Sequence, residues 1–149
     1  MSQLDLKPGF EEVFTVLEYY DGPRTGIANF SGKPHFYDCI WDEARNNYSN
    51  RFRLTLIPDH IFDLALEDWS IGERWRSAFR AGETTLESHA ALPKDTKRYD
   101  EILDVLAPVL RTNSATCVTR IGSFEHVSVP TLFRSVVIDM QVRWIEDTA

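Results

Sequence analysis

The chain of 149 residues has few of the features that mark secreted, disulfide-linked or membrane-spanning proteins. It has two cysteines, Cys39 and Cys117, which are far apart and form no C-x-x-C pair. No apolar run approaches the roughly 18 residues that a membrane-spanning helix needs. The polar segment 1–9 lacks the apolar core of a secretory signal. We therefore expect a cytoplasmic protein with reduced thiols that does not bind membranes.

Common catalytic and cofactor motifs are also missing. The sequence contains no G-x-S-x-G, no Walker loop, no G-x-G-x-x-G, no H-E-x-x-H and no EF-hand spacing. We therefore expect no cofactor, and the absence of these motifs favours a protein that is not an enzyme.

Positive charge is scarce. The chain has 16 Lys and Arg against 23 Asp and Glu, for a net charge of −7. Binding to a nucleic-acid backbone depends on clustered Lys and Arg, so the charge argues against a nucleic-acid partner and against an anionic membrane surface. It suits a protein partner with a basic surface, although a moderate negative charge also serves solubility.

The length and composition are those of an ordinary globular domain. Apolar residues make up 43% of the chain and charged residues 26%. A chain of this size can bury a self-sufficient core without disulfides or metal. The sequence has no internal repeat, low-complexity segment or linker, so we expect one domain over residues 1–149.

The N-terminal part predicts an antiparallel meander followed by a fourth strand. Segments rich in β-branched and aromatic residues are separated by short turn clusters, as Asp21-Gly22-Pro23 illustrates. Gly26 inside the second segment indicates a bulge or a close backbone contact. In the fourth segment the alternation places Phe52, Leu54 and Leu56 inward and Thr55 outward. The four predicted strands are 13–20, 25–30, 34–41 and 51–57.

A long helix is predicted to follow, from residue 59 to residue 81. Its apolar face would contain Phe62, Ala65, Leu66 and Trp69, opposite a polar band. An alternative is a break in the helix near Ser70. Ser70 and Glu73 match the S-x-x-E pattern of a capping box, and Gly72 lies inside it. Apolar residues at three- and four-residue spacing predict a second helix over 94–110.

The C-terminal part again predicts strands. Segments 115–121 and 124–129 suit a hairpin whose turn is Gly122-Ser123. In the segment 136–144 apolar and polar residues alternate, with Met140, Val142 and Trp144 on the apolar side. A strand with one solvent-exposed face is typical of an antiparallel sheet.

Strands and helices therefore occur in separate runs, which is typical of the α+β class. We expect a curved, mainly antiparallel sheet of six to seven strands, formed by the N-terminal meander and the C-terminal strands. Two helices would pack on one face of this sheet. A partly closed barrel is the alternative.

Two groups of residues are candidate contact sites. Asp59, Asp63 and Glu67 form an acidic ridge on the long helix, which suits either a solvated face or a basic partner. Aromatic residues are concentrated near the meander, and Tyr37, Trp41 and Trp69 could line a pocket between the meander and the long helix.

Three further sets of residues are candidates for metal binding or catalysis. His35 and Cys39 share one strand face, but their backbones would be about 13 Å apart, so we expect no metal site. His60 and Asp63 are neighbours at helical spacing and could form an acid–base pair. Asp38 is a candidate buried charge, paired with Arg53 or Arg143; in the alternative Tyr37, Cys39 and Trp41 face the core and Asp38 is exposed.

These features favour a small acidic protein that binds another macromolecule without catalysis, as an inhibitor, immunity or adaptor protein. The alternative is a small-molecule binding module with an aromatic pocket. A third hypothesis is an enzyme of unrecognised type that uses Asp38, His35 or His60.

Overall fold

The computed structural model of the chain describes residues 6–127 and 140–147, which form two compact units. The barrel unit takes the described residues up to Ile57 and from Arg111 onward, and the helical unit is Pro58–Leu110. The chain therefore leaves the barrel after its fourth strand, forms two helices and returns for the fifth. The expectation of one domain stays a prediction.

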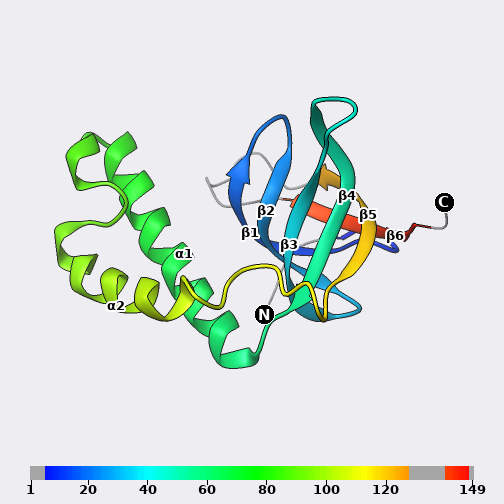
Figure 1. The fold of residues 1–149 in the computed structure, drawn as a ribbon. Coiled ribbons are helices and arrows are strands. Elements are labelled where there is room, and N and C mark those ends of the chain that lie inside the picture. The colour runs from blue at the N-terminus through cyan, green and yellow to red at the C-terminus, as the bar shows by residue number, and fades with distance from the viewer. Residues whose placement is uncertain (1–5, 128–139, 148–149) are drawn as a thin grey trace. The chain divides into compact units, whose positions relative to one another are not determined.

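Six antiparallel strands close the barrel in the order in which they occur in the sequence (Figure 1). Neighbouring strands pair all the way round, and β1 pairs with β6 to complete the circle. Closure leaves neither outer strand as the edge of an open sheet. The strands are β1 Glu11–Tyr19, β2 Pro23–Phe30, β3 Lys33–Asp42, β4 Asn47–Leu56, β5 Val118–His126 and β6 Met140–Glu146.

The expected α+β class is confirmed, and the barrel that the sequence left as an alternative is the form that the sheet takes. The N-terminal meander is confirmed as β1, β2 and β3. The expected packing of the helices on the sheet concerns both units and stays a prediction. Segment 128–139, which includes the first part of the predicted last strand, lies outside the described residues.

Four aromatic side chains from four consecutive strands fill the barrel. They are Tyr37, Phe52, Phe124 and Trp144, and all six pairs of ring centroids lie 5.3–6.3 Å apart. These separations suit tilted and edge-to-face packing of rings. The interior is therefore a packed aromatic core, completed by smaller apolar side chains such as Val13 and Val142.

Two glycines inside strands leave the space that these rings occupy. A Cβ atom at Gly122 would lie 2.7 Å from Cζ3 of Trp144 and 2.9 Å from Cδ1 of Phe52. A Cβ atom at Gly26 would lie 2.2 Å from the carbonyl oxygen of Thr15 and 2.5 Å from the hydroxyl of Tyr37. That hydroxyl donates a 3.0 Å hydrogen bond to the same carbonyl. The close backbone contact expected at Gly26 is confirmed.

The segment before β5 is held against the outside of β3 and β4. Thr112 donates a hydrogen bond of 2.8 Å to Asp38, and the backbone N–H of Asn113 donates one of 3.0 Å to the hydroxyl of Thr55. Thr55 lies on the outer face of β4, as predicted, but it is buried because this segment covers it, and the hydrogen bond from Asn113 satisfies its hydroxyl. Leu56 lies on the same face of β4 as Leu54, as predicted, but it is the last residue of the strand and is 56% exposed.

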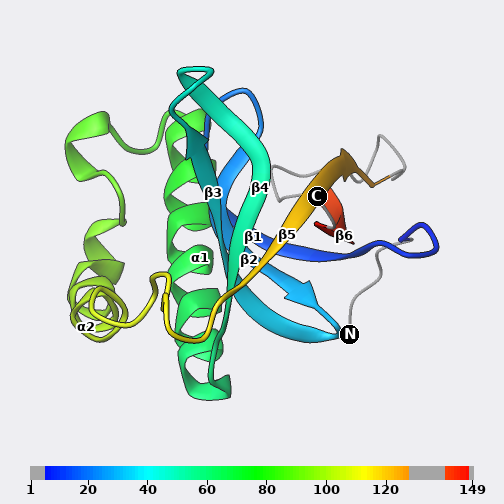
Figure 2. The same cartoon turned by 45° about the vertical axis from the view of Figure 1, so that its right-hand side comes forward.

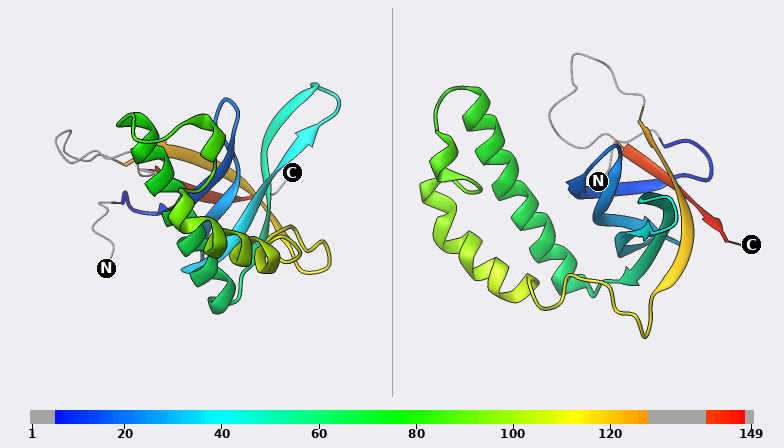
Figure 3. Two further views of the ribbon diagram at one scale, coloured as in Figure 1. Left: turned by 90° about the vertical axis from the view of Figure 1, so that its left-hand side faces the viewer. Right: turned by 45° about the horizontal axis from the view of Figure 1, so that its top comes forward.

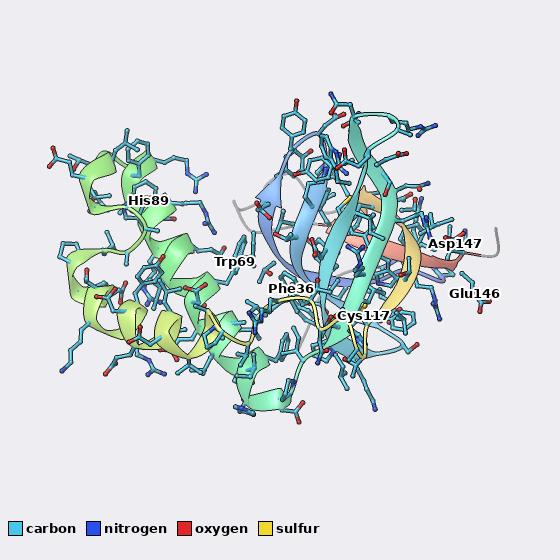
Figure 4. All side chains as sticks on the ribbon, viewed as in Figure 1. Phe36, Trp69, His89, Cys117, Glu146 and Asp147 are labelled. Atoms are coloured by element: carbon cyan, nitrogen blue, oxygen red, sulfur yellow. The ribbon has the colours of Figure 1, made fainter. Side chains whose placement is uncertain are left out.

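The predicted hairpin across Gly122-Ser123 is also wrong. Residues 118–126 form the single strand β5, which is paired with β6 from Arg120 to His126 (Figure 2). At the far end of β6, Glu146 and Asp147 lie next to each other (Figure 4), and Asp147 forms an ion pair of 2.7 Å with Arg51 of β4.

The helical unit contains α1, Asp59–Arg80, and α2, Thr96–Leu106 (Figure 3). Short 3₁₀ turns at Leu86–Ser88 and Pro93–Asp95 lie between them. α1 is continuous, so the alternative with a break near Ser70 is wrong. The second helix ends four residues earlier than predicted, before Pro108.

The buried residues of α1 differ from the predicted set. Phe62, Leu66 and Trp69 are half-buried, whereas Ala65 is buried as expected. The indole of Trp75 packs on other parts of this unit: it stacks on Phe79, meets His89 edge-on and donates a 2.8 Å hydrogen bond to Ser88. The buried side of α1 is therefore shifted around the helix relative to the apolar face that sequence periodicity predicts. The buried residues of α1 are Ile61, Ala65, Ile71, Trp75 and Ala78.

Two ion pairs show that α1 and α2 run antiparallel. Glu67 of α1 pairs with Arg98 of α2, and Arg74, two turns further along α1, pairs with Asp95 just before α2 begins. Both contacts are bidentate, with distances between 2.7 and 3.0 Å. They are solvent-exposed, so they select the register of the two helices more than they stabilise the unit.

Candidate functional site

The three predicted pocket residues lie in different surroundings. Tyr37 is fully buried in the barrel core, and burial raises the pKa of its hydroxyl. Trp41 lies near the end of β3 and is 43% exposed. Trp69 belongs to the helical unit, where the guanidinium of Arg76 lies 4.6 Å from its ring. A pocket between the meander and the long helix would involve both units and stays a prediction.

The acidic ridge of α1 is partly neutralised within its own unit. Asp59 and Asp63 are exposed, whereas Glu67 accepts both hydrogen bonds from Arg98, and this contact lowers the pKa of the Glu67 carboxyl. The neighbouring Asp68 behaves in the opposite way, because burial raises its pKa. The ridge therefore presents two exposed carboxylates.

The residues considered for catalysis in the barrel unit do not converge. His35 lies on the inner face of β3 with Tyr37 and Cys39, and Asp38 lies on the outer face opposite Arg53. Asp38 is half-buried and accepts its hydrogen bond from Thr112. The alternative is correct for Tyr37 and Cys39, which face the core, but not for Trp41, which is 43% exposed, or for Asp38, which is half-buried rather than exposed.

The thiols and potential metal ligands are dispersed. Cys39 is buried in β3 and Cys117 precedes β5 (Figure 4), and both are free. Within residues 6–127 and 140–147, no three His, Cys, Asp or Glu side chains come close enough together to hold a metal ion.

The β1–β2 and β3–β4 turns lie at the same end of the barrel (Figures 1 and 2). A pocket of about 330 Å³ opens at this end. The ladder between β4 and β5 extends only as far as Arg51 opposite Ile121, and β5 continues for five more residues. The pocket occupies this opening. Its lining consists of Tyr19, Asp21, Gly22, Pro23, Arg24, Ser49, Asn50, Phe52, Gly122, Phe124, Glu125, His126 and Met140.

The lining separates into an apolar floor and a polar rim. Phe52, Gly122, Phe124 and Met140 belong to the inner face of the barrel, where Phe52 and Met140 are buried. The polar groups of the rim are the guanidinium of Arg24, the hydroxyls of Tyr19 and Ser49, the amide of Asn50, the imidazole of His126 and the carboxylates of Asp21 and Glu125. An apolar floor with a few convergent polar groups is the usual composition of a ligand site.

Arg24 is the central polar residue of this rim. Its Nε donates to the carbonyl oxygen of Tyr20 at 2.7 Å and its Nη2 to that of Asp21 at 3.0 Å. Its Nη1 donates to Sγ of Cys39 at 3.6 Å, and the guanidinium lies 4.6 Å from the ring of Tyr48. These contacts hold the guanidinium in place at the wall of the pocket.

An exposed aromatic cluster adjoins Arg24. It consists of Tyr20, Trp41 and Tyr48, with ring centroids 5.1 Å apart for Trp41 and Tyr48 and 6.2 Å apart for Tyr20 and Tyr48. Tyr20 is 67% exposed and the neighbouring Tyr19 is 66% exposed. The concentration of aromatics noted near the meander therefore separates into a buried core and an exposed group.

Sequence reasoning missed most of the pocket. Arg24 was not singled out, and Gly122 was predicted to lie in the turn of a hairpin. One signal was available: a glycine within a β-rich segment can also mark a close approach of side chains inside a strand. Nothing in the sequence indicated that the ends of β4 and β5 separate, because that depends on pairing between distant segments.

The described barrel is thus an antiparallel up-and-down barrel with an aromatic interior and a pocket at one end. Comparison with protein-family models, with curated proteins and with solved structures finds no match to this chain. Among the described residues, no helix combines the length and the apolar character that crossing a membrane requires.

Proposed function

We propose that this protein is a binding module that holds a small molecule in the pocket at the open end of its barrel. The observation that carries the proposal is the pocket of about 330 Å³ with an aromatic floor and a polar rim. Ligand sites in proteins begin at about this volume, around 300 Å³. This pocket is a different one from the aromatic pocket expected from sequence, because Tyr37, Trp41 and Trp69 do not line it.

The packing beneath the pocket supports this proposal. Phe52 and Phe124 lie 5.4 Å apart and are both held by Tyr37 and Trp144. A floor supported in this way is already formed before a ligand arrives, so binding costs little conformational entropy. The side chains therefore favour a planar apolar body lying on the floor.

A fragment screen by two-dimensional NMR tests the proposal. We expect hits to shift the backbone signals of Ser49, Gly122 and Phe124 and to compete with one another for one site. Asn50→Trp should weaken these hits at least tenfold, because the indole would occupy the exposed rim. Ser123→Trp is the matched control, since Ser123 is exposed on the outer face of β5 and does not line the pocket.

Hits that scatter over the surface, or that respond equally to both substitutions, would rule out this pocket as the binding site.

A second candidate function is the binding of a protein partner, which the exposed Tyr19, Tyr20 and Trp41 favour. Exposed Tyr and Trp side chains are enriched among the residues that dominate interface energies. The net charge of −7 suits a partner with a basic surface. This candidate and the first use neighbouring parts of the same barrel end.

A pull-down from native extract at low and high salt tests the second candidate. We expect a stoichiometric partner that is retained at low salt, released at high salt and lost with the double variant Tyr20→Ser, Trp41→Ser. Recovery of the same proteins by the variant and the parent chain would count against it.

A further inference from the structure

We infer that the pocket at the barrel end selects a small organic anion, with a carboxylate on Arg24 and a planar apolar body on Phe52 and Phe124. This inference rests on the proposed small-molecule function and specifies the chemistry of its ligand. Three features of the pocket carry it: the uncompensated charge of Arg24, the donors that Arg24 has left, and the aromatic floor.

The groups that hold Arg24 are neutral. Two of them are the backbone carbonyls of Tyr20 and Asp21, and the third is the thiol of Cys39. Burial outweighs the influence of Arg24 and raises the pKa of this thiol, which therefore stays protonated at neutral pH. These contacts orient the guanidinium without neutralising it.

Arg24 also differs from the arginines with carboxylate partners. Across the described parts of the chain, the arginines in ion pairs are Arg45, Arg51, Arg74 and Arg98. Arg24 is half-buried and belongs to none of these pairs. A partly buried charge that lacks an opposite charge is stabilised by an anionic ligand, because the attraction is stronger where water is excluded.

The two carboxylates at the rim do not cancel this charge. Glu125 lies on the outer face of β5 and pairs with Lys7 at 2.5 Å. Asp21 is exposed at the turn, and its contact with Arg24 is through its backbone oxygen. Charges on solvated side chains are strongly screened.

The guanidinium still has donors for a ligand. Its three hydrogen bonds use one N–H on each of its three nitrogens, and each terminal nitrogen carries a second N–H. A planar fork of this kind matches a carboxylate better than a single ammonium does. Because Arg24 lines the same pocket as Phe52 and Phe124, one ligand can use both.

The test compares 2-naphthoate with its uncharged amide, 2-naphthamide, by NMR titration of the full chain at low salt. The two probes share the aromatic body and differ in charge. We expect the acid to bind at least tenfold more tightly than the amide, with shifts at Arg24 Nε, Gly122 and Phe124. Added salt should reduce this preference.

Three variants test whether Arg24 causes the preference for the acid over the amide. Arg24→Gln should reduce the acid-to-amide ratio to within twofold of one. Arg45→Gln removes the same charge from an exposed position at the β3–β4 turn and should leave the ratio unchanged. Arg24→Lys, which keeps the charge, should retain part of the preference. A two-dimensional spectrum of each variant verifies the fold, and the ratio in the parent chain is informative even if Arg24→Gln does not fold.

The outcomes separate the two proposals. Equal binding of acid and amide at the pocket would overturn the anion inference and leave the small-molecule function standing. An acid preference that survives Arg24→Gln, or that disappears equally with Arg45→Gln, would also overturn the inference. If neither probe shifts the pocket signals, the inference fails, and the fragment screen decides the proposed function separately.

Discussion

Single atoms decide how the barrel interior is filled. Gly26 and Gly122 have no Cβ atom, and side chains of neighbouring strands occupy the space that it would need. The Tyr37 hydroxyl lies there at Gly26, and the rings of Phe52 and Trp144 lie there at Gly122. Neither glycine is required for its backbone angles, since both are absent from the positions with positive φ. Their role is close packing, and packing of this density tolerates no added methyl group without a shift.

We predict that Gly26→Ala destabilises the protein by about 3 kcal/mol, the upper part of the usual range for overpacking. The new Cβ would collide with the carbonyl oxygen of Thr15, which belongs to the backbone and has little freedom to move. It would also disturb the hydrogen bond from Tyr37 to that oxygen. Urea unfolding followed by circular dichroism measures the change.

Gly72→Ala is the matched control. Gly72 lies within α1, and the nearest atom to its added Cβ is Nη1 of Arg76 at 3.3 Å, the end of a flexible side chain. Alanine favours a helix interior over glycine by about 1 kcal/mol, so this substitution should be neutral or stabilising. Equal destabilisation by both substitutions would show that the steric account of Gly26 is wrong.

At the scale of elements, α1 shows why a local motif does not decide a helix boundary. Ser70, Gly72 and Glu73 satisfy the pattern of a capping box. The helix nevertheless continues, because buried residues lie on both sides of Ser70, and only an unbroken helix presents all of them on one side. They are Ile61 and Ala65 before Ser70 and Ile71, Trp75 and Ala78 after it. Burial of these side chains outweighs the cost of one glycine in the helix.

We predict that Ser70→Pro costs about 3 kcal/mol or more, because proline removes a hydrogen bond inside the helix and clashes with the preceding turn. Ser70→Ala, at the same exposed position, should be neutral or slightly stabilising. Thermal unfolding of both variants measures the difference. Tolerance of proline at this position would restore the alternative of two shorter helices.

At the scale of the whole molecule, the helical unit is inserted between β4 and β5, and both junctions are tied to the barrel. The N–H of Ile57 donates to the carbonyl oxygen of Pro34 at 3.1 Å, and Thr112 and Asn113 bond to side chains of β3 and β4. β4 and β5 are neighbours in the barrel although some sixty residues separate them in the chain. Both ends of the insertion are thus anchored on the barrel beside the two strands that they join.

We predict a single cooperative unfolding transition, as expected for one domain of this length. Far-UV circular dichroism at 222 nm follows mainly the helices, and the NMR signals of Gly122 and Phe124 follow the barrel. The two signals should give the same midpoint in urea. Two separate midpoints would show that the barrel unit and the helical unit unfold independently.

The sequence by itself determined the class of the fold and most of its elements. Alternation and turn clusters located β1 to β4, and helical periodicity located α1 and α2, since these patterns are set by neighbours within a few residues. The same reasoning identified an unusual number of aromatic residues near the meander and a close contact at Gly26. It left open whether the sheet closes.

Tertiary structure alone decided the closure of the barrel, the inner position of Tyr37 and the assembly of the pocket. Arg24 is joined there by Phe52 and Phe124, which come from strands that follow much later in the chain. It also decided that Gly122 packs inside a strand where a turn was predicted. The physical reason is that pairing, burial and charge compensation depend on segments distant in sequence, whereas propensity and periodicity report only on local neighbours.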